Sequence, residues 1–545
     1  MKFGSVLAGL AAIFLAVPSA AQPAPEFSAD AFRAHVVFLA DDLLEGRDTG
    51  SRGYDIAARY VAAQFAALGL RPGANGSWYQ PVEFMRFAVT GTPTLRVGGH
   101  LFSHGREMIM RASPQASALD FSAPLLFAGY GLDMPGHGFD DYRGLDARGH
   151  VVVVLDGTPQ GTPSDVAAHL NAEKSRMAAA RGAIGMIVVR TRAAAARASW
   201  QRSLRSAGRP GMTWIERDGT PFVDGAGLRF SATLDGGPAE TLFHGARRPL
   251  DALLDEAARA RARPRGFALA QNVHVLREAA AGTRLASPNV VALLPGSDPD
   301  VAQEYVLLMA HLDHLGIREA RPGDAAGADR INNGAMDNAT GIATLIEVAR
   351  AMSRPGSRPR RPILIAAVAA EERGLLGADF LARHPLTGNG RVVAVVNLDM
   401  PILTYDFSDV TAFGAEHSTL GPIVARAASL MGVRVSPDPL PEERLFTRSD
   451  HYKFVRLGVP AVFLMTGFAG EGGREFRRFL DTRYHTPGDD LGLPFNWAAG
   501  ARFAQLNYLI AREIANAPAA PLWYAGSFFG DTFGGDQPRA QRPAR

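Results

Sequence analysis

Five polar clusters in the second half of the chain carry residue types that bind metals or transfer protons. They are His311-Leu312-Asp313, Asp337-Asn338, Glu371-Glu372, Asn397-Leu398-Asp399 and His485. Each cluster follows an apolar run or lies in a tight loop flanked by glycine. One histidine beside a strand is usually structural, and the Glu371-Glu372 pair alone could equally begin a helix, where acidic residues favour the helix dipole. Five such clusters at successive strand ends of one sheet are hard to explain by packing, so we interpret them together as a site.

The composition of these clusters indicates bound cations. Buried carboxylates cost several kcal/mol unless they are paired or bound to metal. A convergent set of carboxylates and imidazoles without any thiolate suits zinc, with cobalt or manganese as alternatives. Cysteine is absent from the chain, which excludes disulfides and thiol catalysis.

The elements that must position these clusters alternate between strand and helix. Apolar runs predict strands, and apolar residues at helical spacing predict helices between them. The predicted strands are 289–294, 305–310, 363–370, 392–397 and 461–465, and the predicted helices are 341–352, 375–383 and 420–431. This alternation predicts an α/β fold, a three-layer sandwich around a mainly parallel sheet. Ligands collect beyond the carboxyl ends of the strands in such sheets, which is where the polar clusters fall.

The sequences around the clusters resemble the motifs of a known family. They read AHLDH at 310–314, GAMDNATG at 334–341, EERGLLG at 371–377, NLDM at 397–400 and YHTPGD at 484–489. All five follow the order found in the co-catalytic dizinc aminopeptidase family, whose relatives include bacterial leucyl-type aminopeptidases, glutamate carboxypeptidase and the transferrin receptor. The similarity covers most of residues 27 to about 515. Two further segments, 149–154 and 180–185, resemble the protease-associated domain that some members carry inserted in the peptidase domain.

The resemblance implies which residues hold the metal ions. His311 and Asp399 would bind one zinc ion, Glu372 and His485 the second, and Asp337 would bridge the two. Two cations about 3.5–4 Å apart can share a hydroxide and polarise a scissile carbonyl. The expected cofactor is therefore two Zn²⁺, with Co²⁺ or Mn²⁺ as substitutes.

Three more residues have implied roles in the chemistry. Glu371 would be the general base, which adjacent glutamates allow because neighbouring side chains leave an extended chain in opposite directions. Asp313 would orient His311 without touching metal, a role worth about 10–100-fold in affinity or activity. Tyr484 resembles the tyrosine that stabilises the oxyanion in some members, although ring packing would equally explain a tyrosine there.

Two other segments invite a functional interpretation. The run Arg448-Ser449-Asp450-His451 could suggest a serine hydrolase, but consecutive residues cannot converge as a triad and the chain has no G-x-S-x-G elbow. We interpret it as a wall of the substrate pocket and assign it no catalytic residue. Arg47 could reach the site, but we expect a surface or hinge position.

Bulk composition narrows the class of protein. With 545 residues the chain should form several domains, and 47% hydrophobic with 20% charged residues is typical of a soluble globular protein. No dense basic block is interleaved with aromatic residues, so nucleic acid is not an expected partner. Lys2, the apolar run 6–17 and the small residues 18–21 predict a secretory signal peptide, with an uncleaved anchor as the alternative. The mature protein should lie in the periplasm or be secreted, without integral membrane association.

The expected domain organisation follows from these patterns. It comprises a signal peptide at 1–21, the N-terminal part of the peptidase domain at 27–116, an inserted α+β protease-associated domain at 117–271, the dizinc catalytic domain at 272–518 and an irregular tail at 519–545. No cluster of His, Asp and Glu near an apolar strand end occurs in the insert, so a lid, a spacer or a protein-partner surface is expected there.

The function expected from the resemblance is an exported metallo-aminopeptidase acting on peptides. A carboxypeptidase with the same metal centre is the nearest alternative, followed by a one-zinc, glutaminyl-cyclase-like acyl transferase and by a non-enzymatic member that only binds partners. All the expected ligand positions are filled, which disfavours the last two. Side-chain preference and oligomeric state do not follow from the motifs.

Overall fold

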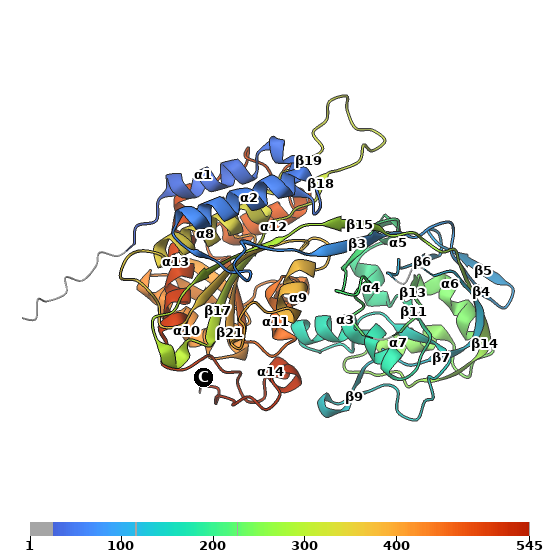
Figure 1. The fold of residues 1–545 in the computed structure, drawn as a ribbon. Helices are drawn as coiled ribbons and strands as arrows, with labels where there is room; N and C mark the ends of the chain where they lie inside the picture. Colours follow the sequence, from blue (N-terminus) through green and yellow to red (C-terminus); the bar gives the residue numbers. More distant parts are fainter. Residues whose placement is uncertain (1–24, 115–116, 206, 226, 544–545) are drawn as a thin grey trace, which may run out of the picture.

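A computed structural model describes residues 25–114, 117–205, 207–225 and 227–543. The predicted signal peptide, 1–21, therefore lies outside the described residues. Within the described ranges, no helix combines the length and apolar character needed to cross a bilayer. The chain forms two lobes, each built on its own sheet (Figure 1).

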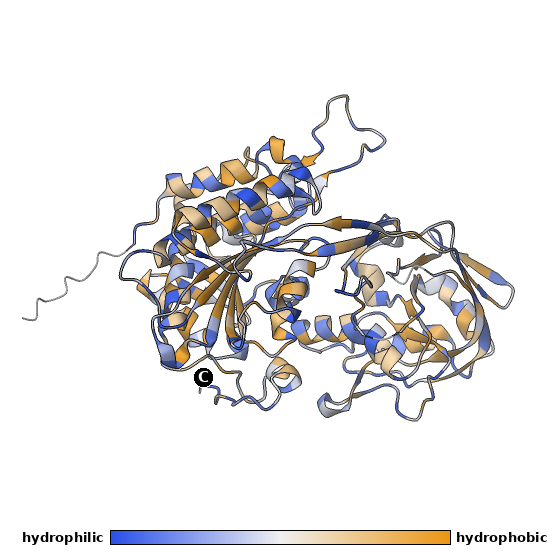
Figure 2. Ribbon diagram, viewed as in Figure 1, coloured by the Kyte–Doolittle hydropathy of each residue, from blue (hydrophilic) through white to orange (hydrophobic). Residues whose placement is uncertain are grey.

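The first lobe is organised around a nine-stranded sheet in the order β1-β16-β20-β17-β21-β24-β22-β23, with β2 beside β16. The strands are β1 (Arg71–Pro72), β2 (Tyr79–Gln80), β16 (Asn289–Leu294), β17 (Glu304–His311), β20 (Ile363–Val368), β21 (Arg391–Leu398), β22 (Asp409–Phe413), β23 (Arg434–Ser436) and β24 (Ala461–Thr466). The four central strands, β20, β17, β21 and β24, run parallel to one another, and their outer neighbours β16 and β22 are antiparallel. They are almost entirely buried and hydrophobic, as strands covered on both faces must be (Figure 2).

Helices cover both faces of this sheet, which confirms the predicted three-layer α/β sandwich. On one face α8 (Thr340–Met352) and α13 (Trp497–Asn516) pack together, with α1 (Ala29–Leu39), α2 (Arg52–Ala67) and α10 (Leu420–Leu430) against them. On the other face lie α9 (Leu376–Arg383) and α11 (His451–Val455) (Figure 1). A further amphipathic helix, α12 (Gly472–Thr482), precedes His485.

The second lobe is an eight-stranded sheet in the order β5-β4-β14-β7-β10-β11-β13-β6. Its strands are β4 (Thr94–Val97), β5 (His100–Ser103), β6 (Met108–Met110), β7 (Leu119–Phe127), β10 (Val151–Leu155), β11 (Gly185–Val189), β13 (Phe230–Leu234) and β14 (Phe267–Arg277). Its helices are α3 (Ser164–Ala180), α4 (Arg192–Arg197), α5 (Trp200–Leu204), α6 (Gly236–Ala239) and α7 (Leu250–Ala257). We call residues 94–277 the inserted domain.

This sheet corrects the predicted boundaries at 117 and 271. Strands β4, β5 and β6 precede residue 117, yet β4 pairs with β14, β6 pairs with β13, and β5 joins the same sheet through β4. β14 itself runs past residue 271 to Arg277. The boundaries were misplaced because the pairing partners are far apart in sequence, whereas composition changes only near residue 117.

A three-stranded sheet joins the two lobes. It contains β3 (Glu83–Phe87), β12 (Gly211–Trp214) and β15 (Thr283–Ala286), in the order β12-β3-β15 (Figure 1). β12 comes from within the inserted domain, and its Trp214 is buried in the core of the first lobe, where Nε1 donates to Asp379 Oδ2 at 3.0 Å. The inserted domain is therefore anchored by a strand and a buried tryptophan as well as by its two chain connections.

The C-terminal tail, expected to be irregular, contains a short helix, α14 (Phe528–Phe533). Trp523 is 1% exposed and its Nε1 donates to the carbonyl of Gly458 at 2.8 Å. Phe528, Phe529 and Phe533 surround His169 of the inserted domain. The tail thus packs where the two lobes meet, because its aromatic residues have apolar surface to bury.

Candidate metal centre

The carboxyl ends of three adjacent parallel strands bring the sequence clusters together. β17 ends at His311, β21 is followed by Asp399, and β20 is followed by Glu371 and Glu372. Met309 of β17 pairs with Asn397 of β21. His311 and Asp399 each follow two residues later in the chain, so they lie side by side at the ends of these two strands. The edge of the sheet therefore carries the imidazole and the carboxylates within reach of one another.

Asp337 lies between two histidines and presents one carboxylate oxygen to each. His311 Nε2 is 3.2 Å from Asp337 Oδ1 and 3.2 Å from Asp399 Oδ1. His485 Nε2 is 3.3 Å from Asp337 Oδ2 and 3.2 Å from Glu372 Oε2. The five residues expected to hold metal thus form two groups that share Asp337.

The hydrogen bonding of His311 shows that this set of donors suits a cation. Its Nδ1 is 3.1 Å from the backbone carbonyl of Asp313 and must donate there, which leaves Nε2 as the ring nitrogen that faces Asp337 and Asp399. Burial lowers the pKa of His311, but the carboxylates of Asp399, Glu371 and Asp337 outweigh burial and raise it well above its ordinary value. Positive charge is therefore favoured between these groups, and imidazole nitrogen with carboxylate oxygen is a donor set that zinc accepts.

Asp313 contacts the site differently from the expected arrangement. The contact with His311 is made by the backbone carbonyl of Asp313, while its carboxylate accepts hydrogen bonds from the amides of Glu371 (3.0 Å) and Glu372 (3.3 Å). Burial raises the pKa of Asp313 to about 6, with His311 opposing the shift. The side chain therefore positions the turn that carries both glutamates.

Glu371 points into the site without a partner of its own. Its side chain lines a pocket at the metal centre, which we call the central pocket. Its carboxylate makes no hydrogen bond or ion pair with another described side chain. Burial raises its pKa well above the ordinary value, and the charges of Glu372, Asp399 and Asp450 add to the shift against the opposing effect of His311. A half-buried carboxylate without a partner is suited to taking up a proton.

The central pocket has a volume of about 60 Å³. Its lining is partly apolar and partly polar, and the polar part includes metal-site carboxylates and a single arginine. The apolar wall is formed by Met400, Leu445, Phe463 and Met465, and the polar lining by His311, Asp337, Glu371, Asp399, Arg448, Ser449 and Tyr484.

Tyr484 stacks its ring on that of His485, with centroids 3.7 Å apart. Burial raises the pKa of Tyr484, and the carboxylates of Asp337 and Glu372 raise it further. Its hydroxyl makes no hydrogen bond with another described residue. The contact with His485 gives the Tyr484 ring a role in packing. The Tyr484 hydroxyl is neutral and is available to donate a hydrogen bond.

Three residues that were predicted neither as metal ligands nor as catalytic residues contact the metal centre. Ser449 donates its hydroxyl to Asp399 Oδ2 and accepts from Asn397 Nδ2. Asp489 accepts from the amides of Met336 (2.8 Å) and Asp337 (3.0 Å) and so fixes the bridging residue. His314 Nδ1 is 2.7 Å from Glu372 Oε1, an attractive pair that is misaligned for a hydrogen bond. His314 and Asp489 lie in the motifs that contain His311 and His485, and Ser449 lies in the run predicted to form a pocket wall.

Arg47 corrects the expectation of a surface or hinge position. Its side chain is 1% exposed and donates to four backbone carbonyls, those of Leu39, Leu312, Asn333 and Gly334. Leu312 lies in the His311 loop, and Gly334 begins the Asp337 loop. Burial lowers the pKa of Arg47 to about 10, with Asp489, Asp313, Asp337 and Glu372 opposing. Arg47 thus ties together two metal-site loops and supplies positive charge behind an acidic centre.

Comparison with known proteins identifies relatives of the region that carries the site. Residues 289–510 match the sequence profile of peptidase family M28. A "Probable zinc metalloprotease" of Pyrenophora teres f. teres is 39% identical over 112 residues, which are 20% of this chain and 22% of that protein. One from Pyrenophora tritici-repentis is 38% identical over 112 residues, 20% of this chain and 23% of that protein. The chain thus aligns with less than a quarter of each of these relatives.

A solved structure shares the fold over most of the chain. It is an aminopeptidase from Aneurinibacillus sp. strain AM-1, with a TM-score of 0.50 and 20% identity. The match covers 91% of this chain and 95% of that one. At this level of identity the likeness concerns the fold.

Proposed function

Since residues 289–510 match the sequence profile of peptidase family M28, we propose that this protein is a zinc-dependent exopeptidase that removes the N-terminal residue of peptides. The observation that carries the proposal is the position of Asp337, whose two oxygens face His311 and His485 separately. The metalloprotease and aminopeptidase names of the similar proteins support it. Two zinc ions per chain, export to the periplasm or medium, and the protease-associated character of the inserted domain are parts of the same proposal.

The residues divide the chemistry among them. His311, Asp337 and Asp399 would hold one zinc ion, and His485, Glu372 and Asp337 the other. Bound there, zinc supplies Lewis-acid polarisation of the carbonyl and lowers the pKa of water. The Glu371 carboxylate accepts a proton from the attacking water and returns it to the nitrogen of the leaving amine. The Tyr484 hydroxyl, which lines the pocket, would donate a hydrogen bond to the carbonyl oxygen as charge develops on it.

The pocket favours an N-terminal residue over a C-terminal one. A free ammonium group entering it would meet the carboxylates of Asp337, Glu371 and Asp399. The small apolar wall fits an uncharged side chain. The single cation, Arg448, is already paired with Glu443 at 2.9 Å.

A carboxypeptidase of the same fold is the second candidate. Arg448 lines the pocket and could bind the terminal carboxylate of a peptide if Glu443 released it. A guanidinium matches a carboxylate with two parallel hydrogen bonds, which makes this the specific observation in favour of the alternative.

Metal analysis and a pair of substrates test the proposal. We expect the purified protein to hold about two zinc ions per chain and to cleave an aminoacyl-anilide. Removal of metal by a chelator should abolish turnover, and added zinc should restore it. A peptide with an acetylated N-terminus should resist cleavage; its cleavage from the C-terminus would instead identify the carboxypeptidase. A protein that binds no divalent metal would contradict both.

A further inference from the structure

A cleft of about 920 Å³ runs between the inserted domain and the peptidase lobe and reaches the central pocket. Arg448 lines both the cleft and the pocket, and Arg373, which follows Glu372 in the chain, also lines the cleft. The cleft therefore adjoins the central pocket at Arg448. A peptide whose terminal residue occupies the small pocket has this cleft as a path for its remaining residues.

Cations dominate the lining of the cleft. Six arginines line it, Arg111, Arg190, Arg209, Arg373, Arg444 and Arg448, together with Lys174, whose pKa burial lowers to about 7. The one carboxylate in the lining is Asp156. The chain as a whole is nearly balanced, with 57 basic and 54 acidic residues, so this excess is local.

Several of these cations lack a counterion. Arg190, Arg373 and Arg448 pair with Asp235, Asp48 and Glu443, which do not line the cleft. Arg111, Arg209 and Arg444 form no ion pair with any residue that the structure describes. Burial lowers the pKa of Arg444, and the like charges of Arg197 and Arg448 lower it further. These three guanidinium groups are free to bind an anionic ligand.

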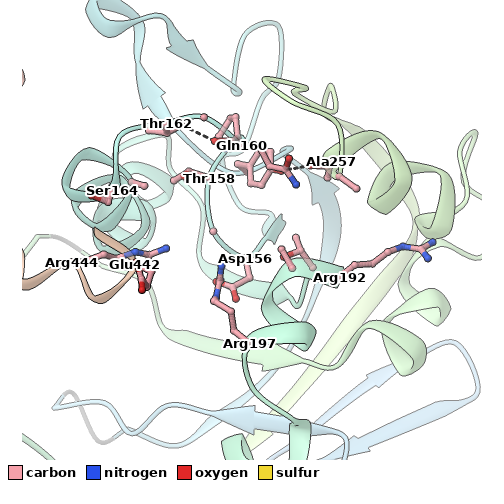
Figure 3. A pocket seen from close by; sticks show the side chains of 18 of the residues that line it. Asp156, Thr158, Gln160, Thr162, Ser164, Arg192, Arg197, Ala257, Glu442 and Arg444 are labelled. Carbon is pink, nitrogen blue, oxygen red and sulfur yellow. Dashed lines mark hydrogen bonds between the residues drawn. The ribbon is translucent and has the colours of Figure 1, made fainter. Parts of the chain in front are cut away.

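A second pocket extends the basic surface along the inserted domain. It has a volume of about 600 Å³ and shares Asp156 and Arg444 with the cleft. Figure 3 shows Arg197 beside Asp156 within this pocket, and Arg444 with Glu442 entering from the peptidase lobe. Arg197 also makes no ion pair among the described residues. This pocket thus adds Arg192 and Arg197 to the arginines of the cleft, with Asp156 and Glu442 as its carboxylates.

We propose that this cleft binds the part of the peptide beyond the cleaved bond and selects peptides with acidic side chains there. The inference rests on the proposed exopeptidase function and specifies its substrate class. Arginine recognises carboxylates with paired hydrogen bonds, and a cleft of one charge sign concentrates ligands of the opposite sign. Phe87 is the one aromatic residue in the lining, so bases would find no stacking surface and nucleic acid is not favoured.

Kinetics with matched peptides test this inference. Two pentapeptide amides, Leu-Ala-Ala-Ala-Ala and Leu-Ala-Glu-Ala-Glu, share the terminal residue and carry no terminal carboxylate. We expect kcat/KM to be about tenfold higher for the acidic peptide at low salt, and the difference to shrink at about 1 M salt, where charges are screened. Arg111→Gln with Arg444→Gln should remove most of the preference.

Two controls separate the outcomes. Hydrolysis of leucyl-anilide, which has no residues to place in the cleft, should be unchanged in the double variant. Arg434→Gln, which removes an exposed arginine from β23 at the far edge of the central sheet, should keep the preference. Equal rates for both peptides, with the anilide still cleaved, would overturn the cleft proposal and leave the exopeptidase intact. If neither peptide nor the anilide is cleaved, the proposed function itself fails.

Discussion

Glu371 and Glu372 are neighbours in the chain but meet different surroundings. Glu372 places Oε2 3.2 Å from His485 and Oε1 2.7 Å from His314, whereas Glu371 lines the central pocket without a side-chain partner. Asp313 holds the backbone amides of both residues. The pair therefore separates into one residue fixed among candidate ligands and one free to move a proton.

Glu371→Gln tests this separation. We expect zinc content to stay at the wild-type level while kcat falls by about 10²–10⁴-fold, because an amide cannot accept the proton of the attacking water. Anilide kinetics and metal analysis of the same preparation provide the measurement. Glu372→Gln is the matched control and should lose zinc. Full turnover in Glu371→Gln would show that another group is the base.

At the scale of secondary-structure elements, the turn formed by Glu45, Gly46 and Arg47 holds two loops of the metal site. They are the His311 loop and the Asp337 loop. All three residues have φ between 51° and 69°, in the left-handed region. A Cβ on Gly46 would lie 2.3 Å from the carbonyl oxygen of Asn332, next to the loop that leads to Asp337. The turn needs glycine because the backbones approach so closely, and the approach lets Arg47 reach both loops.

Gly46→Ala should therefore disturb the metal centre from a distance. We expect the free energy of unfolding to fall by roughly 3 kcal/mol or more and zinc to be held more weakly, because the Asn332 backbone must move. Denaturant unfolding and zinc retention during dialysis measure the two effects. Gly69→Ala is the matched control: Gly69 also has a left-handed φ, of 72°, but its Cβ would meet nothing within 4 Å. It should cost only about 1–2 kcal/mol and leave zinc binding unchanged.

At the scale of the whole molecule, the two lobes and the tail meet around His169. Its Nδ1 is 2.7 Å from the Tyr452 hydroxyl of the peptidase lobe, and Phe528, Phe529 and Phe533 of the tail pack on its ring. Burial lowers the pKa of His169 to about 3, and the charges of Arg456 and Arg176 add to the effect. The contact between the lobes is therefore built for a neutral imidazole.

This contact should weaken in acid. The folded pKa lies below the ordinary value near 6.5, so the stabilisation is complete above pH 6.5 and is lost as pH falls towards 3. We expect the drop in Tm between pH 8 and pH 5 to be smaller in His169→Asn than in the wild type. Tyr452→Phe, which removes the hydrogen bond but keeps the imidazole, should lower Tm while retaining the pH dependence. An unchanged pH dependence in His169→Asn would contradict this account.

The sequence by itself determined the central strands, the helices between them and the polar clusters at the strand ends. Predicted strand 289–294 matches β16, and 392–397 lies within β21 (Arg391–Leu398). These features were predictable because hydrophobic periodicity and the residue types after a strand are local properties. The side chains expected at the site, His311 and Asp399 among them, come together because parallel strands place their carboxyl ends at one edge.

Only the tertiary structure decided what supports and surrounds that site. Arg47 donates to Leu312, which is 265 residues away in the chain, and nothing near Arg47 in sequence indicates that partner. β4 and β5 belong to the inserted domain because β4 pairs with β14, far along the sequence. The basic cleft likewise gathers arginines from several segments of both lobes. Contacts of this kind depend on which surfaces meet after folding, and local sequence patterns do not contain that information.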